Sequence, residues 1–463
     1  MEVWTTELAG WTGLQGAIAA VVVLLSYVVF FIPKSSSSSK DGKRLKRRMS
    51  GLGLTTILTE TETNLSILFS VLTFERIVPR DVIVERFRER MVGDFFFRFR
   101  STVVGNDFVL DPNFDPAKNI STYKLRDGET MLLRAQSLYN APLDKNKPLW
   151  DMELVEEGGK THVLLRTHHC LGDGASVWKV YMTVFDMDQK LEIPSIPKGP
   201  KPSLFSQIAY IAWSIYVYVI KLAKLFLTNE STAYFKQPGS PSKRLAFSST
   251  LKVDETKVIG KAIGASINDV MLSAVAGGLF DILPPEEKKR AENGGFLRTA
   301  IPIDMRHPAA PWPTTNNRFS SLMINLPIGV SDRIQRTKAI VKSMGVAKTS
   351  LEKIFTMFIN RLSWPMPKPI MVAITHSFTQ RISVAVTNVR GPPVRFSLGD
   401  IKLEMFRGFI PPPPSVNVGI AITSFANELF FSVATDKSID ATKLMSAIEA
   451  EYRAMQAATA KSN

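Results

Sequence analysis

The sequence predicts two folded domains, each containing strands and helices, behind an N-terminal membrane anchor. The chain has 463 residues with a 45% hydrophobic share, which is enough to bury two substantial cores. A proline-rich stretch, Ile193 to Pro202 (IPSIPKGPKP), interrupts the middle of the chain and cannot continue a helix or a central strand. We therefore place a first domain at about 55–190, a crossover linker at 191–244 and a second domain at about 245–460.

Residues 1–33 are expected to anchor the chain in a membrane. Gly13 to Ile32 is nearly all apolar, and a helix of about 20 such residues spans roughly 30 Å, the hydrocarbon thickness of a bilayer. Residues 34–54 form a basic, serine-rich linker with seven lysines and arginines between positions 34 and 48. Positive charge marks the cytosolic flank, and a cleavable signal peptide would carry its charge in front. We therefore expect a single-pass anchor with the rest of the chain in the cytosol.

A hairpin is predicted immediately before the most informative motif of the chain. Trp150 to Glu157 (WDMELVEE) alternates apolar and polar residues, and Thr161 to Thr167 (THVLLRT) is apolar and β-prone. Gly158-Gly159 separates the two segments, a strong signal for a tight turn between antiparallel strands. The second strand therefore ends at a pair of histidines.

The motif is His168 to Gly174 (HHCLGDG), in a chain with only five histidines. Gly172 and Gly174 bracket Asp173, and we expect them to allow a sharp turn with positive φ. Beyond the turn, Ala175 to Met187 carries apolar residues at helical spacing and is predicted to be a helix.

The two histidines cannot both enter one cavity, because adjacent residues on a strand point to opposite faces. A neutral imidazole can act as a general base toward an alcohol. Asp173 could orient that imidazole, or it could lock the turn through an ion pair. The alternative interpretation of His168 and His169 is a pair of structural histidines. No metal site is expected, because the spacing fits no zinc pattern and neighbouring side chains diverge.

Cys170 is the only cysteine. The chain can therefore form no intrachain disulfide, which fits a reducing compartment. Its side chain diverges from that of His169, so we interpret Cys170 as a small packing residue and not as a nucleophile.

The motif and its surroundings resemble the wax ester synthase/diacylglycerol acyltransferase family of CoA-dependent acyltransferases. Further blocks resemble those of the family and occur in the family's order: Ala141–Glu157 (APLDKNKPLWDMELVEE), Gly264–Gly278 (GASINDVMLSAVAGG), Ile301–Arg306 (IPIDMR) followed by Asn316-Asn317, Thr387–Pro392 (TNVRGP), and the final strands within Met405–Asp436. The resemblance runs from about Leu65 to the C-terminus. Thr387 stands where serine is usual, and Asn316 stands where glycine is usual.

The resemblance implies an α/β fold of two similar domains, each a mixed sheet flanked by helices, with a tunnel between them. It implies that the motif residues His168, His169, Asp173 and Gly174 form the catalytic centre, with His169 as the general base. Acyl-CoA would be the co-substrate and no other cofactor would be needed. The acceptor would be a long-chain alcohol or diacylglycerol, and the choice between them stays open.

Residues of the second domain are implied to complete the site. Asn268 would donate a hydrogen bond or position the substrate, although an asparagine at the start of a helix can equally be its N-cap. Thr387, Asn388 and Gly391 would also position the substrate, and Asp173 would form a structural ion pair with Arg306.

Two other functions are alternatives to this one. A catalytically inactive, membrane-anchored lipid-binding member of the fold would have no reason to keep an intact histidine motif. An acyltransferase for a soluble small alcohol would be expected to carry an Asp-Phe-Gly-Trp-Gly sequence near its C-terminus, and this chain has none.

The formal net charge is +15, and a basic chain raises the question of nucleic-acid binding. The stretch from Lys34 to Arg48 alone supplies seven positive charges against Asp41, and no nucleic-acid-binding motif accompanies the remainder. Membrane lipids and the phosphates of CoA are the simpler partners. With a lipid acceptor, the endoplasmic reticulum is the expected membrane.

Leu204 to Leu227 is a second long apolar segment, rich in tyrosine and tryptophan. A second crossing would put the two halves of one catalytic unit on opposite sides of the membrane. We therefore expect a helix lying in the membrane interface, with Tyr210, Trp213, Tyr216 and Tyr218 at the boundary and Lys221 and Lys224 toward the headgroups. A buried interdomain helix is the alternative.

Three glycosylation sequons begin at Asn64, Asn119 and Asn229. Glycosylation requires luminal exposure, so none of them should be used if the domains lie in the cytosol.

Overall fold

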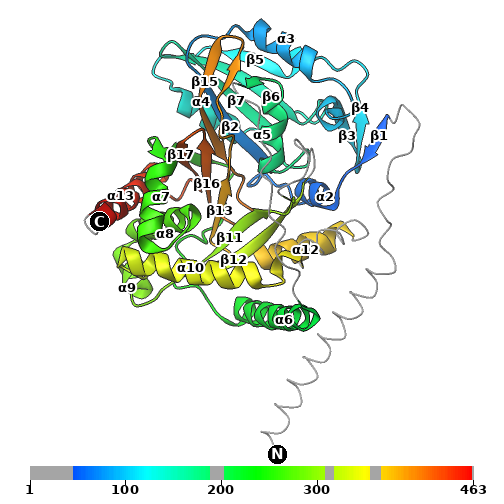
Figure 1. Ribbon diagram of the computed structural model, residues 1–463. Coiled ribbons are helices and arrows are strands. Elements are labelled where there is room, and N and C mark those ends of the chain that lie inside the picture. Colours follow the sequence, from blue (N-terminus) through cyan, green and yellow to red (C-terminus); the bar gives the residue numbers. More distant parts are fainter. Residues whose placement is uncertain (1–44, 188–202, 308–316, 355–366, 461–463) are drawn as a thin grey trace, which may run out of the picture.

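The computed structural model describes residues 45–187, 203–307, 317–354 and 367–460. The predicted anchor at 1–33, most of the basic linker, the proline-rich break and Asn316 lie outside the described residues. Figure 1 shows two sheets, one above the other, each accompanied by helices. The mixed α/β class predicted from the sequence is therefore confirmed.

The first sheet has seven strands in the order β5-β6-β7-β2-β15-β14-β8. Strands β5 and β6 are parallel, and the other pairs are antiparallel. The strands are β2 (Ile67–Phe74), β5 (Ile120–Tyr123), β6 (Trp150–Glu157), β7 (Lys160–His168), β8 (Asp186–Met187), β14 (Phe396–Leu398) and β15 (Ile401–Phe409). The β6–β7 hairpin is the predicted one, and its turn holds Gly158 and Gly159 at φ 59° and 75°.

Short helices pack an aromatic core against this sheet. They are α2 (Gly51–Leu58), α3 (Arg80–Arg90), α4 (Met131–Tyr139) and α5 (Gly174–Met182), with single turns at Phe97–Arg100 and Pro116–Lys118. Phe87 of α3 stacks on Trp150 of β6 with ring centroids 5.8 Å apart, and Tyr181 of α5 lies 6.0 Å from Trp150. Burial of such rings contributes more than any other type of contact to a core.

The helix predicted up to Met187 ends earlier than expected. Helix α5 stops at Met182, and Asp186–Met187 forms β8 at the edge of the sheet. Asp186 accepts hydrogen bonds of 2.8 Å from both Arg86 and Arg90. These long-range partners fix the segment as a strand, and helical spacing could not reveal them.

The second sheet has the order β10-β17-β16-β13-β11-β12, with β9 also paired to β17. Strand β13 runs parallel to β11 and β16, so this sheet is also mixed. The strands are β9 (Lys243–Phe247), β10 (Leu251–Lys252), β11 (Leu297–Asp304), β12 (Phe319–Leu326), β13 (Val384–Val389), β16 (Val418–Phe425) and β17 (Glu428–Asp436). Its helices are α7 (Val253–Ile263), α8 (Ile267–Asp281), α9 (Pro285–Ala291), α10 (Arg333–Thr349), α12 (Lys368–Thr379) and α13 (Ala441–Ala460).

Helix α8 lies at the centre of the second domain. Its residues are almost all buried from Asp269 to Leu279. A Cβ on Gly278 would lie 2.8 Å from the backbone nitrogen of Ile448, so a glycine there lets α13 approach closely. This helix carries the predicted site residue Asn268 at its first turn.

Two strands from the C-terminal half complete the N-terminal sheet. Strand β15 pairs with β2 over Leu403–Phe409, and β14 joins β15 to β8. The two predicted domains are therefore not contiguous in sequence, because residues 396–409 belong to the first sheet. Part of the predicted linker is also folded, since β1 (Lys46–Arg48) pairs with β4 (Asp107–Leu110), beside β3 (Ser101–Val104).

Helix α6 (Leu204–Leu227) has the bounds of the second apolar segment. Of the described helices, it is the single unbroken one long and apolar enough to cross a membrane. Most of its surface is exposed, with Ser214, Val217 and Leu225 buried, so the alternative of a buried interdomain helix is wrong. Lys221 was expected at the headgroups, but it forms an ion pair with the buried Glu352.

Candidate active site

His168 is the last residue of β7 and is buried, with 2% of its surface exposed. Its Nδ1 accepts a hydrogen bond of 3.1 Å from the backbone nitrogen of Cys170. An acceptor Nδ1 places the proton of the neutral ring on Nε2. Burial, and then the neighbouring His169, lower the pKa of His168 to about 3. His168 is therefore a neutral residue that holds the turn.

His169 is the first residue after the strand and is only partly buried. Its backbone nitrogen donates 2.8 Å to the carbonyl of Ser66, which adopts a left-handed φ of 50°. The imidazole lies 5.4 Å from the ring of Phe319, at the start of β12. Burial lowers its pKa, and the negative charge of Asp173 opposes this effect. His169 is consequently neutral at physiological pH.

Asp173 is buried, and its carboxylate accepts three hydrogen bonds, none of them from a histidine. One oxygen caps α5 by accepting 2.9 Å from the backbone nitrogen of Ser176. The other accepts 2.8 Å from Arg306 and 2.7 Å from the backbone nitrogen of Arg318. The expected ion pair with Arg306 is thus present, and both of its side chains are 5% exposed. Asp173 ties the motif to the ends of β11 and β12.

Limited space, and not a positive φ, requires a glycine at position 172. Neither Gly172 nor Gly174 is in the left-handed region, so that expectation was wrong. A Cβ on Gly172 would lie 2.6 Å from Oγ of Ser176, in the first turn of α5. Asp173 makes the turn as the N-cap of α5, because its side chain binds the backbone of the first helical turn.

Asn317 contributes a contact that the sequence did not assign to it. Its side-chain nitrogen donates 2.8 Å to the carbonyl of His169 and lies 3.4 Å from that of Cys170. Asn317 is buried. In the sequence Asn317 stands out only as part of a family block, and no local pattern indicates which carbonyl its side chain reaches.

Three of the predicted site residues of the second domain, Asn268, Thr387 and Asn388, lie on α8 and β13. A Cβ on Gly174 would lie 3.6 Å from Val389, the last residue of β13. The adjacent Asn388 is exposed, and its side chain donates 3.4 Å to the oxygen of Asn268. Asn268 is not the N-cap of α8, because Ser266 caps it in a capping box with Asp269.

Thr387 and Gly391 flank Asn388 and have structural surroundings. Thr387 is buried within β13, opposite Ala421 of β16. The backbone nitrogen of Gly391 donates 3.2 Å to the hydroxyl of Ser424, and a Cβ there would overlap the Ser424 carbonyl. Only glycine fits at that position.

Cys170 is fully buried in the first core, and burial raises the pKa of its thiol well above the usual value. The thiol is therefore protonated and packs as a small apolar side chain. Within the described residues, no group of three or more His, Cys, Asp or Glu side chains could hold a metal ion.

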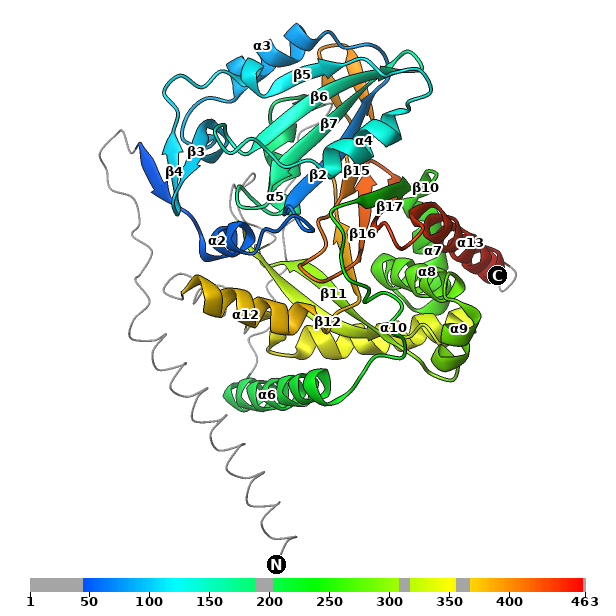
Figure 2. The same cartoon turned by 180° about the vertical axis from the view of Figure 1, so that it is seen from behind.

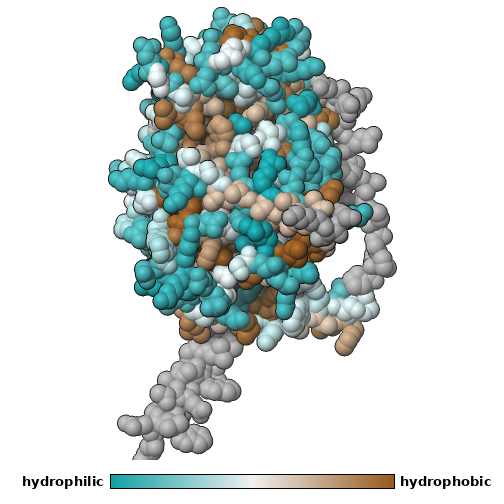
Figure 3. Space-filling model, turned by 90° about the vertical axis from the view of Figure 1, so that its left-hand side faces the viewer, coloured by the Kyte–Doolittle hydropathy of each residue, from teal (hydrophilic) through white to brown (hydrophobic). Residues whose placement is uncertain are grey.

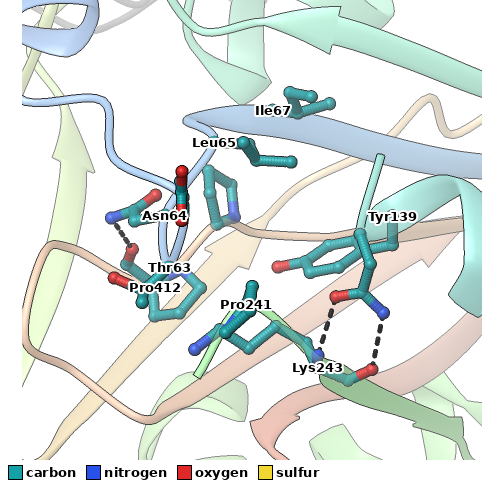
Figure 4. A pocket seen from close by; sticks show the side chains of 11 residues that line it. Thr63, Asn64, Leu65, Ile67, Tyr139, Pro241, Lys243 and Pro412 are labelled. Carbon is teal, nitrogen blue, oxygen red and sulfur yellow. Dashed lines mark hydrogen bonds between the residues drawn. The ribbon is translucent and has the colours of Figure 1, made fainter. Parts of the chain in front are cut away.

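Two cavities lie where the two halves meet, close to the N-terminal end of β2. Figure 4 shows the narrower one, in which Asn64 points to Pro412 and donates 2.6 Å to its carbonyl. Its volume is about 20 Å³, and the neighbouring cavity of about 270 Å³ shares Thr63, Asn64 and Lys243 with it. Neither cavity is lined by His168 or His169. The predicted tunnel therefore stays a prediction.

Comparison with known proteins finds a matching family domain in each half of the chain. The catalytic domain of wax ester synthase/diacylglycerol acyltransferase matches residues 49–210, and the C-terminal domain of the same family matches residues 315–456. A probable diacylglycerol O-acyltransferase of Mycobacterium tuberculosis is 24% identical over 381 residues, 74% of this chain and 79% of the relative. Another relative from the same organism is 24% identical over 388 residues, 78% of this chain and 84% of the relative.

Solved structures share the fold. The wax ester synthase/diacylglycerol acyltransferase of Marinobacter aquaeolei VT8 has a TM-score of 0.62 at 14% identity, covering 89% of this chain and all of that chain. The trichothecene 15-O-acetyltransferase of Fusarium sporotrichioides has a TM-score of 0.63 at 13% identity, covering 92% and 96%. The fold and the domain matches together define an acyltransferase. More specifically, the chain belongs to the wax ester synthase/diacylglycerol acyltransferase family.

Proposed function

We propose that the enzyme transfers a fatty acyl group from acyl-CoA to a long-chain alcohol, to diacylglycerol, or to both. The products are a wax ester or a triacylglycerol and free CoA. One observation carries the proposal: His169 is a partly accessible, neutral imidazole at a turn fixed by Ser66 and Asn317. The names of the Mycobacterium and Marinobacter proteins support these acceptors.

In the proposed reaction, His169 accepts the proton of the acceptor's hydroxyl group. At the same time, the hydroxyl oxygen attacks the carbonyl carbon of the thioester. The resulting tetrahedral oxyanion collapses, the carbon–sulfur bond breaks, and the protonated His169 returns its proton to the CoA thiolate. A general base of this kind contributes about 10²–10⁴-fold. Positioning and oxyanion stabilisation must supply the remainder of the rate enhancement.

Asn268 is the proposed donor or positioning group. Because Ser266 caps α8, the Asn268 side chain is not required at the helix end. An amide donates without titrating, and Asn388 fixes its oxygen from β13. Thr387 and Gly391 are proposed to hold Asn388 in place, and His168 and Gly174 to hold the turn.

We further propose that the two substrates approach through a tunnel between the sheets, from opposite sides. The Asp173–Arg306 pair supports this, because it joins the turn of one domain to a strand end of the other. The residues that react would then lie at the junction of the two domains.

The experiment is an assay of the purified full chain with acyl-CoA and each lipid acceptor in turn. Free CoA is measured together with the neutral lipids that form. Equal release of CoA and ester with a lipid acceptor supports the proposal. Release of CoA without ester, or ester formation only with small soluble alcohols, contradicts it.

Anchoring by residues 1–33 in the endoplasmic reticulum, with both domains in the cytosol, completes the proposal. Fewer of the three sequons can test this orientation than the sequence suggested. The side chains of Asn64 and Asn119 are buried and donate to backbone carbonyls, so neither could carry a glycan in this fold. Asn229 is exposed, so its glycosylation can report on which side of the membrane it lies. Endoglycosidase treatment should give no mobility shift, and a glycan on Asn229 would place this face in the lumen.

A further inference from the structure

Helix α6 forms a layer of its own beneath α10 and α12, as both views show (Figures 1 and 2). The part of α6 from Ser214 onward is docked on the body. The hydroxyl of Ser214 donates 2.7 Å to the carbonyl of Thr349 at the end of α10, and Lys221 pairs with Glu352. Arg298 of β11 donates to the carbonyl of Lys224 at 3.1 Å. These contacts fix the helix on the second domain.

The part of α6 that precedes Ser214 has an exposed surface. Every residue from 203 to 213 is exposed, including Leu204 at 72%, Phe205 at 82% and Trp213 at 53%. A helix on the surface of a soluble protein exposes one polar face and buries the other. Among residues 204–213 only Ser206 and Gln207 are strongly polar, so most of this segment is apolar and requires an apolar medium around it. The described chain supplies none at this position.

The exposed apolar surface of the described chain is concentrated here. Of its 24 exposed large hydrophobic side chains, twelve lie in α6, and Val346, Ile354, Ile370 and Val372 add four in or next to α10 and α12. Figure 3 shows hydrophobic side chains at the lower end of the molecule, the end that α6 forms in Figure 1. Contiguous surface of this kind marks an interaction site.

The charged side chains within the helices of this surface have one sign. Helices α6, α10 and α12 contain no aspartate or glutamate, but they carry two, five and one lysines or arginines respectively. Lys338, Lys342 and Lys348 of α10 and Lys368 of α12 are exposed. Such a surface attracts anionic phospholipid headgroups. A symmetric contact with a second copy would bring the same positive helices together.

We propose that α6 and α12 form a membrane-docking surface that lies within the interface of an anionic phospholipid bilayer. The N-terminal half of α6 is immersed at the boundary between headgroups and acyl chains. Its C-terminal half holds the second domain on the membrane. Because Ser214 and Lys221 bind the body, α6 lies along the membrane plane and does not cross the bilayer. The proposal does not depend on which acyl acceptor the enzyme uses.

The test uses the full chain bound to vesicles of phosphatidylcholine and phosphatidylserine. Single cysteines replace Phe205 and Ile208 in α6, or Val104 and Leu133 on the first domain, and each is labelled with an environment-sensitive nitrobenzoxadiazole dye. Cys170 is fully buried and does not compete for the label. All four positions are exposed, and every variant keeps its N-terminal segment, so the comparison is matched.

The α6 labels should shift to the blue and be quenched by nitroxide-bearing lipids, whereas the labels at 104 and 133 should not. Removing phosphatidylserine should reduce the quenching at 205 several-fold. Labels at 205 and 208 that remain water-exposed overturn the proposal. Energy transfer between copies without nitroxide quenching would assign the surface to a second copy instead. A further label at Val219 that lies at the bilayer centre would make α6 a span.

Discussion

The two sides of the site are built differently. On the first domain, the turn from His168 to Asp173 is fixed by hydrogen bonds to Ser66, Asn317, Arg306 and Arg318, all of them between 2.7 and 2.9 Å. On the second domain, one bond of 3.4 Å joins Asn388 to Asn268, and Asn388 is exposed. The turn that carries His169, the proposed base, is therefore held rigidly, whereas the proposed positioning side can adjust to a substrate. Substitutions on the first side should affect chemistry and folding, and those on the second should affect substrate binding.

The largest effect is expected for His169→Ala. Loss of the general base should lower kcat by at least about 10²–10⁴-fold while the protein still accumulates in membranes. His168→Ala is the matched control and should be less severe, because that ring serves the turn and not the reacting hydroxyl. Ester synthesis is measured for both at equal protein. Wild-type activity in the His169 variant would refute the mechanism.

The next effect concerns stability. In Arg306→Ala, the buried carboxylate of Asp173 loses its cation, which costs about 3–5 kcal/mol. Expression and the thermal midpoint should therefore fall together with activity. Arg76→Ala is the control, because it breaks a pair with Asp400 whose side chains are 52% and 84% exposed, and such pairs contribute about 0–1 kcal/mol. Equal thermal midpoints for the two variants would contradict a structural role for Asp173.

A smaller effect is expected in the pH profile. Burial holds the pKa of His169 below 6.5, so the base form persists as the pH falls through 6.5 and is lost only on protonation at the lowered pKa. The acid limb of kcat/KM should therefore lie below pH 6.5. His168, with a pKa of about 3, remains neutral throughout this range. An acid limb at or above 6.5 would show that another group titrates.

The smallest effect is expected for Asn388→Ala. The KM for the acceptor should rise a few-fold with little change in kcat, and stability should change by no more than about 0.5 kcal/mol, as for other exposed positions. Asn268→Ala should reduce kcat more, because Asn268 is the proposed donor. Steady-state kinetics with both acceptors separate these cases. An unfolded Asn388 variant would mean that the second side is as rigid as the first.

Local patterns predicted the parts of the fold that neighbouring residues determine. The glycine pair fixed the β6–β7 hairpin, and apolar composition located α6 from Leu204 to Leu227. The pairing of Asp173 with Arg306 came from the resemblance. The insertion of β14 and β15 into the first sheet could not be predicted, because strand pairing across the whole chain leaves no trace in local spacing.

The missed parts of the site have the same cause. The bond from Asn317 to the His169 carbonyl and the bond from Arg318 to Asp173 join segments far apart in sequence. Arg318 donates to Asp173 through its backbone nitrogen, and every residue other than proline has such a group. The residue type at position 318 therefore could not indicate this hydrogen bond.

The insertion of β15 beside β2 also sets an order for biosynthesis. Strand β2 emerges from the ribosome early and pairs with β7, but its other edge meets β15 only after residue 409 has been made. Until then β2 presents unpaired backbone groups, and open edges of this kind invite aggregation. A chain that ends after β7 but before β14 would leave that edge open permanently, so an early stop between residues 168 and 396 should yield insoluble protein.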